Sequence, residues 1–121
     1  MVEVYRKGDF QKPDRRKANR DRRAHARYIF FADCELTDQS TGSYYENRVT
    51  DISQGGCFVD LTVAIPQGTE VHIRVRKDNH IFETQGVAAY TYPSMGIGIA
   101  FVRVSPENQQ ILDAWVQELT R

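Results

Sequence analysis

Residues 69–104, "TEVHIRVRKDNHIFETQGVAAYTYPSMGIGIAFVRV", decide the fold class, because they contain three strand-like runs joined by tight turns. In the first run Val71, Ile73 and Val75 alternate with polar or charged residues, and a period of two is typical of a half-buried β-strand. The stretches "KDNH" and "PSMG" between the runs have the composition of turns. Such short connections predict antiparallel pairing of neighbouring strands. The expected strands are residues 69–76, 81–92 and 96–104.

Three further strands are predicted upstream of this stretch. From Tyr28 to Leu36 every second residue is apolar or aromatic; the turn sequence "DQSTGS" follows this run, and "IPQG" follows the third run. Six short strands without intervening helices indicate an antiparallel barrel or sandwich. We favour a barrel, because closing a small sheet removes its edges. The upstream strands are expected at residues 28–37, 44–52 and 56–62.

The last segment changes its period and predicts one amphipathic helix, residues 106–120. Ser105 is a favourable N-cap and Pro106 a favourable first helical residue. Trp115 shares an apolar stripe with residues one turn before and after it, which indicates a core anchor rather than a ligand platform. The predicted fold is therefore all-β with a C-terminal helix: a six-stranded antiparallel β-barrel capped by one α-helix.

Charge divides the chain into two parts although the net charge is zero. The chain has 16 Lys or Arg and 16 Asp or Glu. Residues 1–27 contain ten of the basic and four of the acidic residues, so residues 28–121 contain six basic and twelve acidic residues. Between Arg6 and Arg27 the only large apolar side chain is Phe10, too little to offset the entropy of ordering the segment. We expect a flexible basic arm over residues 1–21 and a barrel domain over 22–121. The charge asymmetry indicates an anionic partner.

Several classes of function lack support in the sequence. No apolar run approaches the ~20 residues of a membrane helix, and the N-terminus has no apolar signal region. Cys34 and Cys57 form neither a disulfide framework nor a metal set, and we expect reduced, buried thiols of a cytoplasmic protein. His25, His72 and His80 share no metal-ligand spacing, and no phosphate loop or nucleophile elbow is present. We therefore expect no enzyme, no metal and no cofactor.

The first binding motif is Arg23-Ala-His-Ala-Arg27, an RxxxR with Arg22 directly before it. The planar guanidinium binds phosphate oxygens bidentately and also reads the O6/N7 edge of guanine. Two arginines four residues apart could grip a compact guanine nucleotide from two sides. The alternative interpretation is a solvated basic tail.

The second motif is Asp51-x-Ser53-x-x-Gly56 in "TDISQGG", residues 50–56. Asp51 can accept hydrogen bonds from guanine N–H donors, Ser53 can donate to a base or phosphate, and Gly56 allows close approach of a ligand. An ordinary Asx or Ser/Thr turn at the end of a strand is the alternative.

Together the two motifs resemble the PilZ domain family, and the resemblance extends to "MGIGIAFV" and the C-terminal helix. It covers nearly the whole chain from Arg22 onward and implies a receptor for the bacterial second messenger cyclic di-GMP. By this resemblance Arg23 and Arg27 would contact phosphates and guanine edges, and Asp51 and Ser53 would bind a guanine. Gly56 would keep the approach open.

The resemblance also implies secondary roles and a stoichiometry. An arginine at position 22 accompanies binding of an intercalated ligand pair in the family, so a stacked dimer of cyclic di-GMP is expected. Additional ligand contacts are expected from residues near the two motifs and in the glycine-containing strand. These are Arg20, His25, Gly55 and Gly98.

Ligand binding is expected to order the arm over the barrel and to create a surface for a partner protein, such as motility, exopolysaccharide or pilus machinery. Two alternatives stay open. A small barrel that binds single-stranded nucleic acid would need exposed aromatic residues for stacking. Tyr44, Tyr45, Tyr90 and Tyr92 could serve, but we interpret them as strand and core residues. The other alternative is a ligand-independent protein-interaction module.

Overall fold

The computed structural model describes residues 25–121. The predicted arm over residues 1–21 lies outside the described residues, as do Arg22 and Arg23, so their expected roles remain predictions. The barrel domain, the end of the RxxxR motif and the whole DxSxxG motif lie within the described part of the chain.

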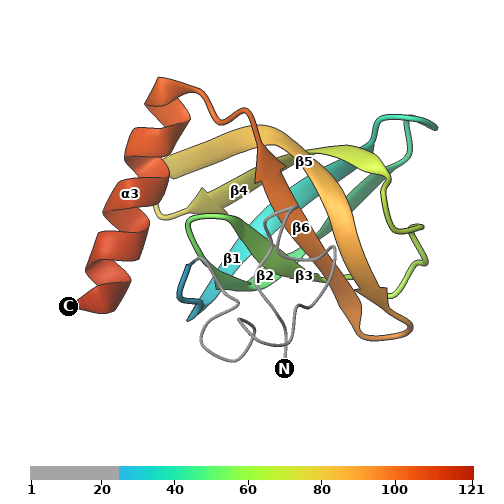
Figure 1. Ribbon diagram of the computed structural model, residues 1–121, viewed down its shortest axis with the longest axis horizontal. Coiled ribbons are helices and arrows are strands. Elements are labelled where there is room, and N and C mark those ends of the chain that lie inside the picture. The colour runs from blue at the N-terminus through green and yellow to red at the C-terminus, as the bar shows by residue number, and fades with distance from the viewer. Residues whose placement is uncertain (1–24) are drawn as a thin grey trace, which may run out of the picture.

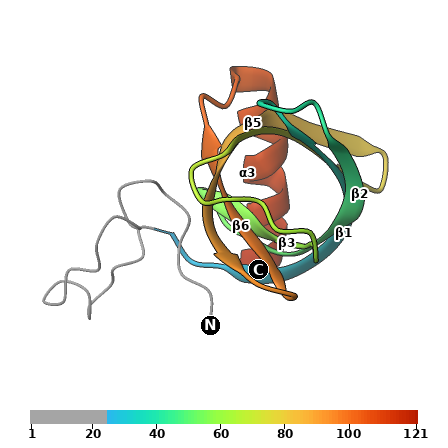
Figure 2. The ribbon, with the colours of Figure 1, turned by 90° about the vertical axis from the view of Figure 1, so that its right-hand side faces the viewer.

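The domain is a closed six-stranded barrel followed by one helix (Figure 1). Around the barrel the order is β1-β2-β3-β6-β5-β4, and every neighbouring pair is antiparallel. Figure 2 shows the ring of strands nearly end-on, with the helix across its far end. The elements are β1 (Tyr28–Asp38), β2 (Tyr44–Ile52), β3 (Gly56–Asp60), β4 (Glu70–Lys77), β5 (His80–Tyr92), β6 (Gly96–Val102) and α3 (Pro106–Thr120). The predicted fold class is confirmed.

The alternation predicted from the sequence fills the barrel interior. In β1 the side chains of Phe30, Ala32 and Leu36 are buried, whereas Ile29 and Phe31 are 74% and 52% exposed. Every strand contributes inward residues of this kind to one continuous apolar core. The largest fully buried side chains are Phe82, Leu36, Ile52, Ile65, Ile73, Ile97, Ile99 and Leu112.

Two strands end earlier than predicted. β3 ends at Asp60, whose carbonyl oxygen accepts a hydrogen bond of 2.9 Å from the Asn47 side-chain amide. β6 ends at Val102, because Arg103 has a φ of +51° and cannot continue an extended strand. Both ends were predicted two residues too late, because neither the hydrogen bond from Asn47 nor the positive φ of Arg103 changes the alternation of apolar residues in the sequence.

Two irregularities reverse the inward and outward sides within a strand. In β2 the register against β3 shifts between Val49 and Asp51, so Val49 faces the core while Asp51 faces outward beside Phe58. In β5 it shifts between Ala88 and Tyr90, which pair with inward Ile99 and outward Gly98 respectively. A β-bulge of this kind turns all following side chains to the opposite face.

The interpretation of the four tyrosines as core residues is wrong for Tyr44, Tyr90 and Tyr92. Tyr92 is 38% exposed and Tyr44 is 54% exposed, and Tyr90 packs in a small cluster separate from the main core. Tyr45 is partly buried against the main core, as expected. A strict period of two would have placed Tyr90 and Tyr92 inside with Phe82, and the bulge explains the difference.

Helix α3 closes one end of the barrel, as predicted. The Ser105 hydroxyl accepts a hydrogen bond from the Asn108 amide at 3.2 Å, which confirms Ser105 as the N-cap. Leu112 is fully buried, and the Trp115 ring lies 5.2 Å from the ring of Phe30 between centroids, so Trp115 anchors the helix on the barrel. No helix within residues 25–121 is both long and apolar enough to cross a membrane.

Both cysteines are buried, unpaired thiols. Burial raises the pKa of Cys34 to about 12, and it raises the pKa of Cys57 well above its ordinary value. Because the thiolate is the reactive form, both residues act as small apolar side chains of the core.

Candidate functional site

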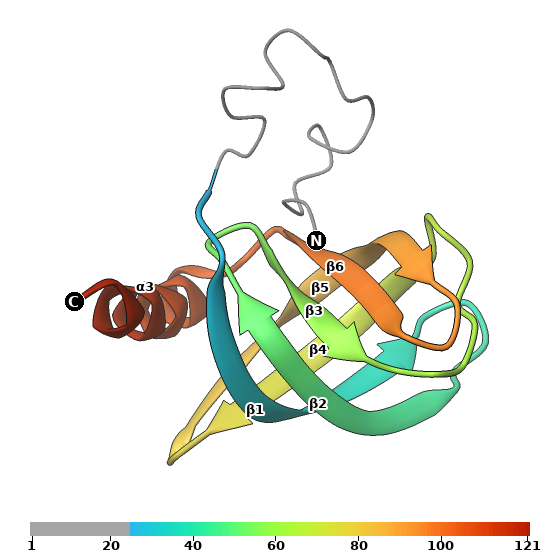
Figure 3. The same ribbon diagram turned by 90° about the horizontal axis from the view of Figure 1, so that it is seen from below.

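The two predicted motifs meet where β1 begins and β2 ends. The hairpin register pairs Tyr28 with Ile52 and Ile29 with Asp51, and Arg27 directly precedes β1. Arg27 Nη1 lies 3.9 Å from Asp51 Oδ2. Figure 3 shows the segment leading into β1 beside the turn between β2 and β3. The structure therefore places Arg27, the last residue of RxxxR, next to Asp51, the first residue of DxSxxG.

Both members of this ion pair are shielded from solvent. The Arg27 side chain is 7% exposed and the Asp51 side chain 20% exposed. In such surroundings the two charges attract each other more strongly than on an open surface. The bulge in β2 is essential to this geometry, because without it Asp51 would share the inward side with Val49.

Ser53 forms the turn between β2 and β3. Its hydroxyl accepts hydrogen bonds from the Gly55 amide at 3.1 Å and the Gly56 amide at 3.2 Å, and lies 3.3 Å from the Gly56 carbonyl oxygen. The residue is fully buried. The Ser/Thr-turn interpretation therefore describes what its side chain does in this structure, whereas direct contact with a ligand stays a prediction.

The same turn is connected to the helix through side-chain amides. Gln54 Nε2 donates to Asp113 Oδ1 at 3.0 Å, and Gln109 Nε2 donates to Gln54 Oε1 at 2.9 Å and to Asp113 Oδ1 at 2.8 Å. None of these three residues was predicted from the sequence to belong to the site. Gln54 lies inside the motif at a variable position, and nothing in the helical pattern distinguishes Gln109 or Asp113 from other exposed polar residues. The contacts link the site to α3.

An aromatic face, formed by Phe58 on β3 and by Tyr90 and Tyr92 on β5, lies on the outer wall, and Phe58 is its member next to Asp51. Phe58 pairs with Asp51 across β2 and β3, and with Gly98 across β3 and β6. Of the additional residues predicted, Gly55 belongs to the Ser53 turn, His25 is half-buried before β1, and Gly98 lies beneath the aromatic face, two strands away from Asp51.

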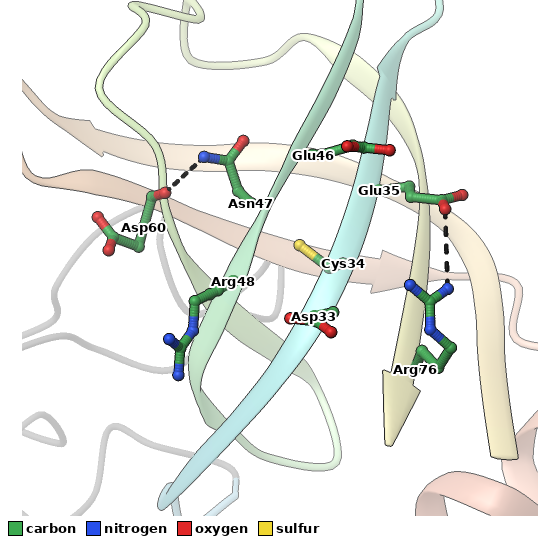
Figure 4. Close-up of a pocket in the computed structure, with 8 residues that line it drawn as sticks. All are labelled: Asp33, Cys34, Glu35, Glu46, Asn47, Arg48, Asp60 and Arg76. Carbon is green, nitrogen blue, oxygen red and sulfur yellow. Dashed lines mark hydrogen bonds and ion pairs between the residues drawn. The ribbon is translucent and has the colours of Figure 1, made fainter. Parts of the chain in front are cut away.

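A separate hollow of about 460 Å³ lies elsewhere on the outer wall (Figure 4). Two contacts join residues of its lining: Arg76 Nη1 lies 3.8 Å from Glu35 Oε2, and the Asn47 side-chain amide donates to the Asp60 carbonyl oxygen. None of the predicted binding residues lines it. Within residues 25–121 no group of three His, Cys, Asp or Glu side chains is placed to hold a metal ion. The lining residues are Asp33, Cys34, Glu35, Glu46, Asn47, Arg48, Asp60 and Arg76.

Comparison with known families identifies the class of this domain. Residues 21–118 match the model of the PilZ domain, and the chain belongs to this family. The match begins just before RxxxR and ends within α3, so it includes both motifs and the complete barrel. A search of curated protein sequences finds no match.

Solved structures share the same fold at low sequence identity. The PilZ domain of YcgR from Escherichia coli, solved with c-di-GMP, has a TM-score of 0.68 and 20% identity, covering 84% of this chain and 93% of that one. The inhibitor of motility MotI from Bacillus subtilis has a TM-score of 0.65 and 17% identity, over 82% of this chain and 52% of that one. The chain thus spans about half the length of MotI. The PilZ domain of CeSA from a cellulose-synthesizing bacterium has a TM-score of 0.64 and 17% identity, over 79% and 99%.

Proposed function

We propose that this PilZ domain is a receptor for cyclic di-GMP with Arg27 and Asp51 at the centre of its site. The observation that carries the proposal is the 3.9 Å approach of Arg27 Nη1 to Asp51 Oδ2, which brings the ends of two motifs to one point of the barrel wall. The structures of YcgR solved with c-di-GMP support the choice of ligand. We infer a binding role rather than a catalytic one.

The ligand offers both chemical groups that this pair recognises. Asp51 accepts hydrogen bonds from the N1–H and 2-amino groups of a guanine, which form a two-donor edge matched to a carboxylate. The guanidinium groups of Arg23 and Arg27 bind phosphate oxygens or the O6/N7 edge of guanine. A phosphate compound without guanine would leave Asp51 facing anionic oxygens, so guanine is an essential part of the ligand.

Ligand binding replaces the Arg27–Asp51 ion pair with two sets of contacts. The pair keeps both side chains near the site before binding. Each group then exchanges one charged partner for hydrogen bonds to the ligand, so neither charge is left without a partner. Ser53, Gly55 and Gly56 contribute by fixing the turn that follows Asp51.

We further propose that Arg20, Arg22 and Arg23 close over the bound ligand. The anionic phosphates supply charge-assisted hydrogen bonds that offset the entropy lost when a basic segment becomes ordered. Arg22 would allow a second ligand to stack on the first, giving two cyclic di-GMP molecules per chain. The rearranged surface would be recognised by a partner protein, so the domain acts as an adaptor.

Isothermal titration calorimetry at near-physiological salt tests the proposal. We expect micromolar or tighter binding of cyclic di-GMP, and loss of at least tenfold in affinity for Arg27→Ala, Arg23→Ala and Asp51→Asn. Arg121→Ala and Asp33→Asn are matched controls, because they remove the same charges from exposed positions. Absence of binding by the unaltered protein, or equal losses in the controls, would contradict the proposal. The fitted stoichiometry distinguishes one ligand from a stacked pair.

The two alternative functions predict different results in simple assays. A nucleic-acid-binding barrel would shift single-stranded oligonucleotides in a gel with strong salt dependence. A ligand-independent interaction module would show the same tryptic cleavage at the arginines of residues 15–23 with and without cyclic di-GMP. Protection of these sites by the ligand supports closure of the arm.

A further inference from the structure

The turn between β2 and β3 is held by contacts of three kinds. Within the turn, the Ser53 hydroxyl accepts hydrogen bonds from the Gly55 and Gly56 amides. On the side of β6, the Gly55 carbonyl oxygen accepts a hydrogen bond of 2.9 Å from the Phe101 amide. On the side of α3, the turn is held by the side chain of Gln54, which is half-buried. The turn that follows the acidic residue of the motif is therefore restrained by its own serine, by β6 and by the helix.

Three side chains form a closed ring of hydrogen bonds between this turn and α3. Gln109 and Asp113 are four residues apart and lie on one face of the helix. Gln54 Nε2 donates to Asp113 Oδ1 at 3.0 Å, and Gln109 Nε2 donates to Gln54 Oε1 at 2.9 Å and to Asp113 Oδ1 at 2.8 Å. Gln54 thus uses both the oxygen and the nitrogen of its amide. A carboxylate accepts two of the three bonds, and such bonds are stronger than those between neutral groups.

The attachment of α3 to the barrel has other anchors. Leu112 is fully buried, and the Trp115 ring lies 5.2 Å from the ring of Phe30 on β1. On β5, the Glu83 amide donates a hydrogen bond of 2.7 Å to Asn108 Oδ1. Hydrogen bonds near the surface add little to the stability of a helix that is already packed in this way. The ring is therefore better explained by its place at the motif turn than by a need to hold the helix.

We propose that Gln54 is a positioning residue of the cyclic di-GMP site, held in place by Gln109 and Asp113 of α3, an inference that rests on the function proposed above. The side-chain amide of Gln54 is bound to α3, so its effect on the ligand passes through the turn. By fixing the turn, the ring also fixes the backbone that leaves Asp51, the residue proposed to bind guanine. A site that is already held in its binding geometry loses less conformational entropy on association. Helix α3 thus contributes to affinity without contacting the ligand.

Two substitutions of Asp113 test this role, because they separate its charge from its hydrogen-bond acceptor. Asp113→Ala removes the acceptor of two bonds and is expected to weaken cyclic di-GMP binding by about three- to tenfold in calorimetry. Asp113→Asn keeps a carbonyl oxygen for both donors and is expected to bind within about twofold of the unaltered protein. Charge alone predicts tighter binding for Asp113→Ala, since the ligand is an anion. Glu118→Ala, which removes an exposed acidic side chain of α3 outside the ring, is the matched control.

A double variant distinguishes positioning from direct contact between Gln54 and the ligand. Gln54→Met keeps the length of the side chain and removes both of its bonds, so it is expected to weaken binding by the same factor as Asp113→Ala. The variant with both substitutions is expected to bind no more weakly than either single variant, because each substitution breaks the same ring. If Gln54→Met weakens binding and Asp113→Ala does not, Gln54 contacts the ligand and the positioning role is overturned. Urea unfolding shows that each variant is folded under the conditions of the titration.

Amide hydrogen exchange without ligand adds an independent readout. In Asp113→Ala the Gly55 and Gly56 amides are expected to exchange faster by about threefold or more, while the amide of Ile73 in β4 is unchanged. A ring that only attaches the helix predicts faster exchange confined to α3 and unchanged affinity. That result, with binding that is still weakened by Asp51→Asn, overturns the positioning role and leaves the proposed function standing. Failure of the unaltered protein to bind overturns both.

Discussion

Replacing Ser53 with alanine separates two roles that the motif residue could have. In the structure its hydroxyl accepts hydrogen bonds from the Gly55 and Gly56 amides, and the residue is fully buried. If Ser53 stabilises the turn, the substitution destabilises the protein in the absence of any ligand. If Ser53 acts only on the ligand, stability is unchanged and affinity alone falls.

The magnitude follows from the two amides that lose their acceptor. A buried backbone donor left without a partner costs about 1 to 3 kcal/mol, so two such donors predict a loss of roughly 2 to 6 kcal/mol in the free energy of unfolding. The hydrogen bond of 2.8 Å from the Ser53 amide to the Gly56 carbonyl oxygen remains, which favours the lower half of this range. For a domain of this size the melting temperature would fall by roughly 10 °C.

Urea unfolding followed by Trp115 fluorescence and far-UV circular dichroism measures this loss. Ser43→Ala is the matched control, since Ser43 lies in an exposed turn and its change is expected to stay within about 0.5 kcal/mol. The reasoning is refuted if Ser53→Ala and Ser43→Ala unfold at the same urea concentration with equal slopes. A stable Ser53→Ala protein with weakened binding would instead assign the hydroxyl to the ligand.

Three further predictions concern the barrel itself. Leu112→Ala, which empties a fully buried position between α3 and the barrel, is expected to cost about 2 to 5 kcal/mol in urea unfolding. Hydrogen bonds from the Ser40 hydroxyl and amide lower the pKa of Asp38 below its ordinary 3.8, so the stability it contributes is present above that pH and is lost as pH falls through the lowered pKa. Asp38→Asn should therefore be less stable than the unaltered protein at pH 7, and the difference should vanish in acid. Cys34 and Cys57 should resist iodoacetamide at pH 8 in the native protein and react in urea, because burial raises both thiol pKa values.

The fold could be predicted because the barrel core is formed by apolar residues that recur at every second position along the strands. Val71, Ile73 and Val75 alternate without interruption, and the structure buries all three. Strand ends were less predictable, because they depend on single events such as the positive φ of Arg103 or the bond from Asn47 to the Asp60 carbonyl oxygen. Neither event alters the apolar pattern from which the strands were inferred.

The proximity of the two motifs could also be predicted from the sequence. In a hairpin whose turn lies at residues 39–43, the start of the first strand must lie beside the end of the second, and Tyr28 indeed pairs with Ile52. The orientation of individual side chains could not be predicted from the sequence. The burial of the Ser53 hydroxyl depends on the turn geometry, and the outward position of Tyr90 and Tyr92 depends on a bulge.

The two bulges show how a barrel with a fully occupied core can carry a site on its outer wall. A regular β2 would place Asp51 on the side of Val49, where an ionised carboxylate would meet apolar side chains at a large cost in free energy. A regular β5 would place Tyr90 and Tyr92 on the side of Phe82, with more volume than the barrel can hold. The bulges avoid both conflicts and turn the carboxylate on β2 and the rings on β5 to the outside of the barrel. The bulge in β2 is therefore the departure from strand periodicity that relates the fold most directly to the proposed binding site.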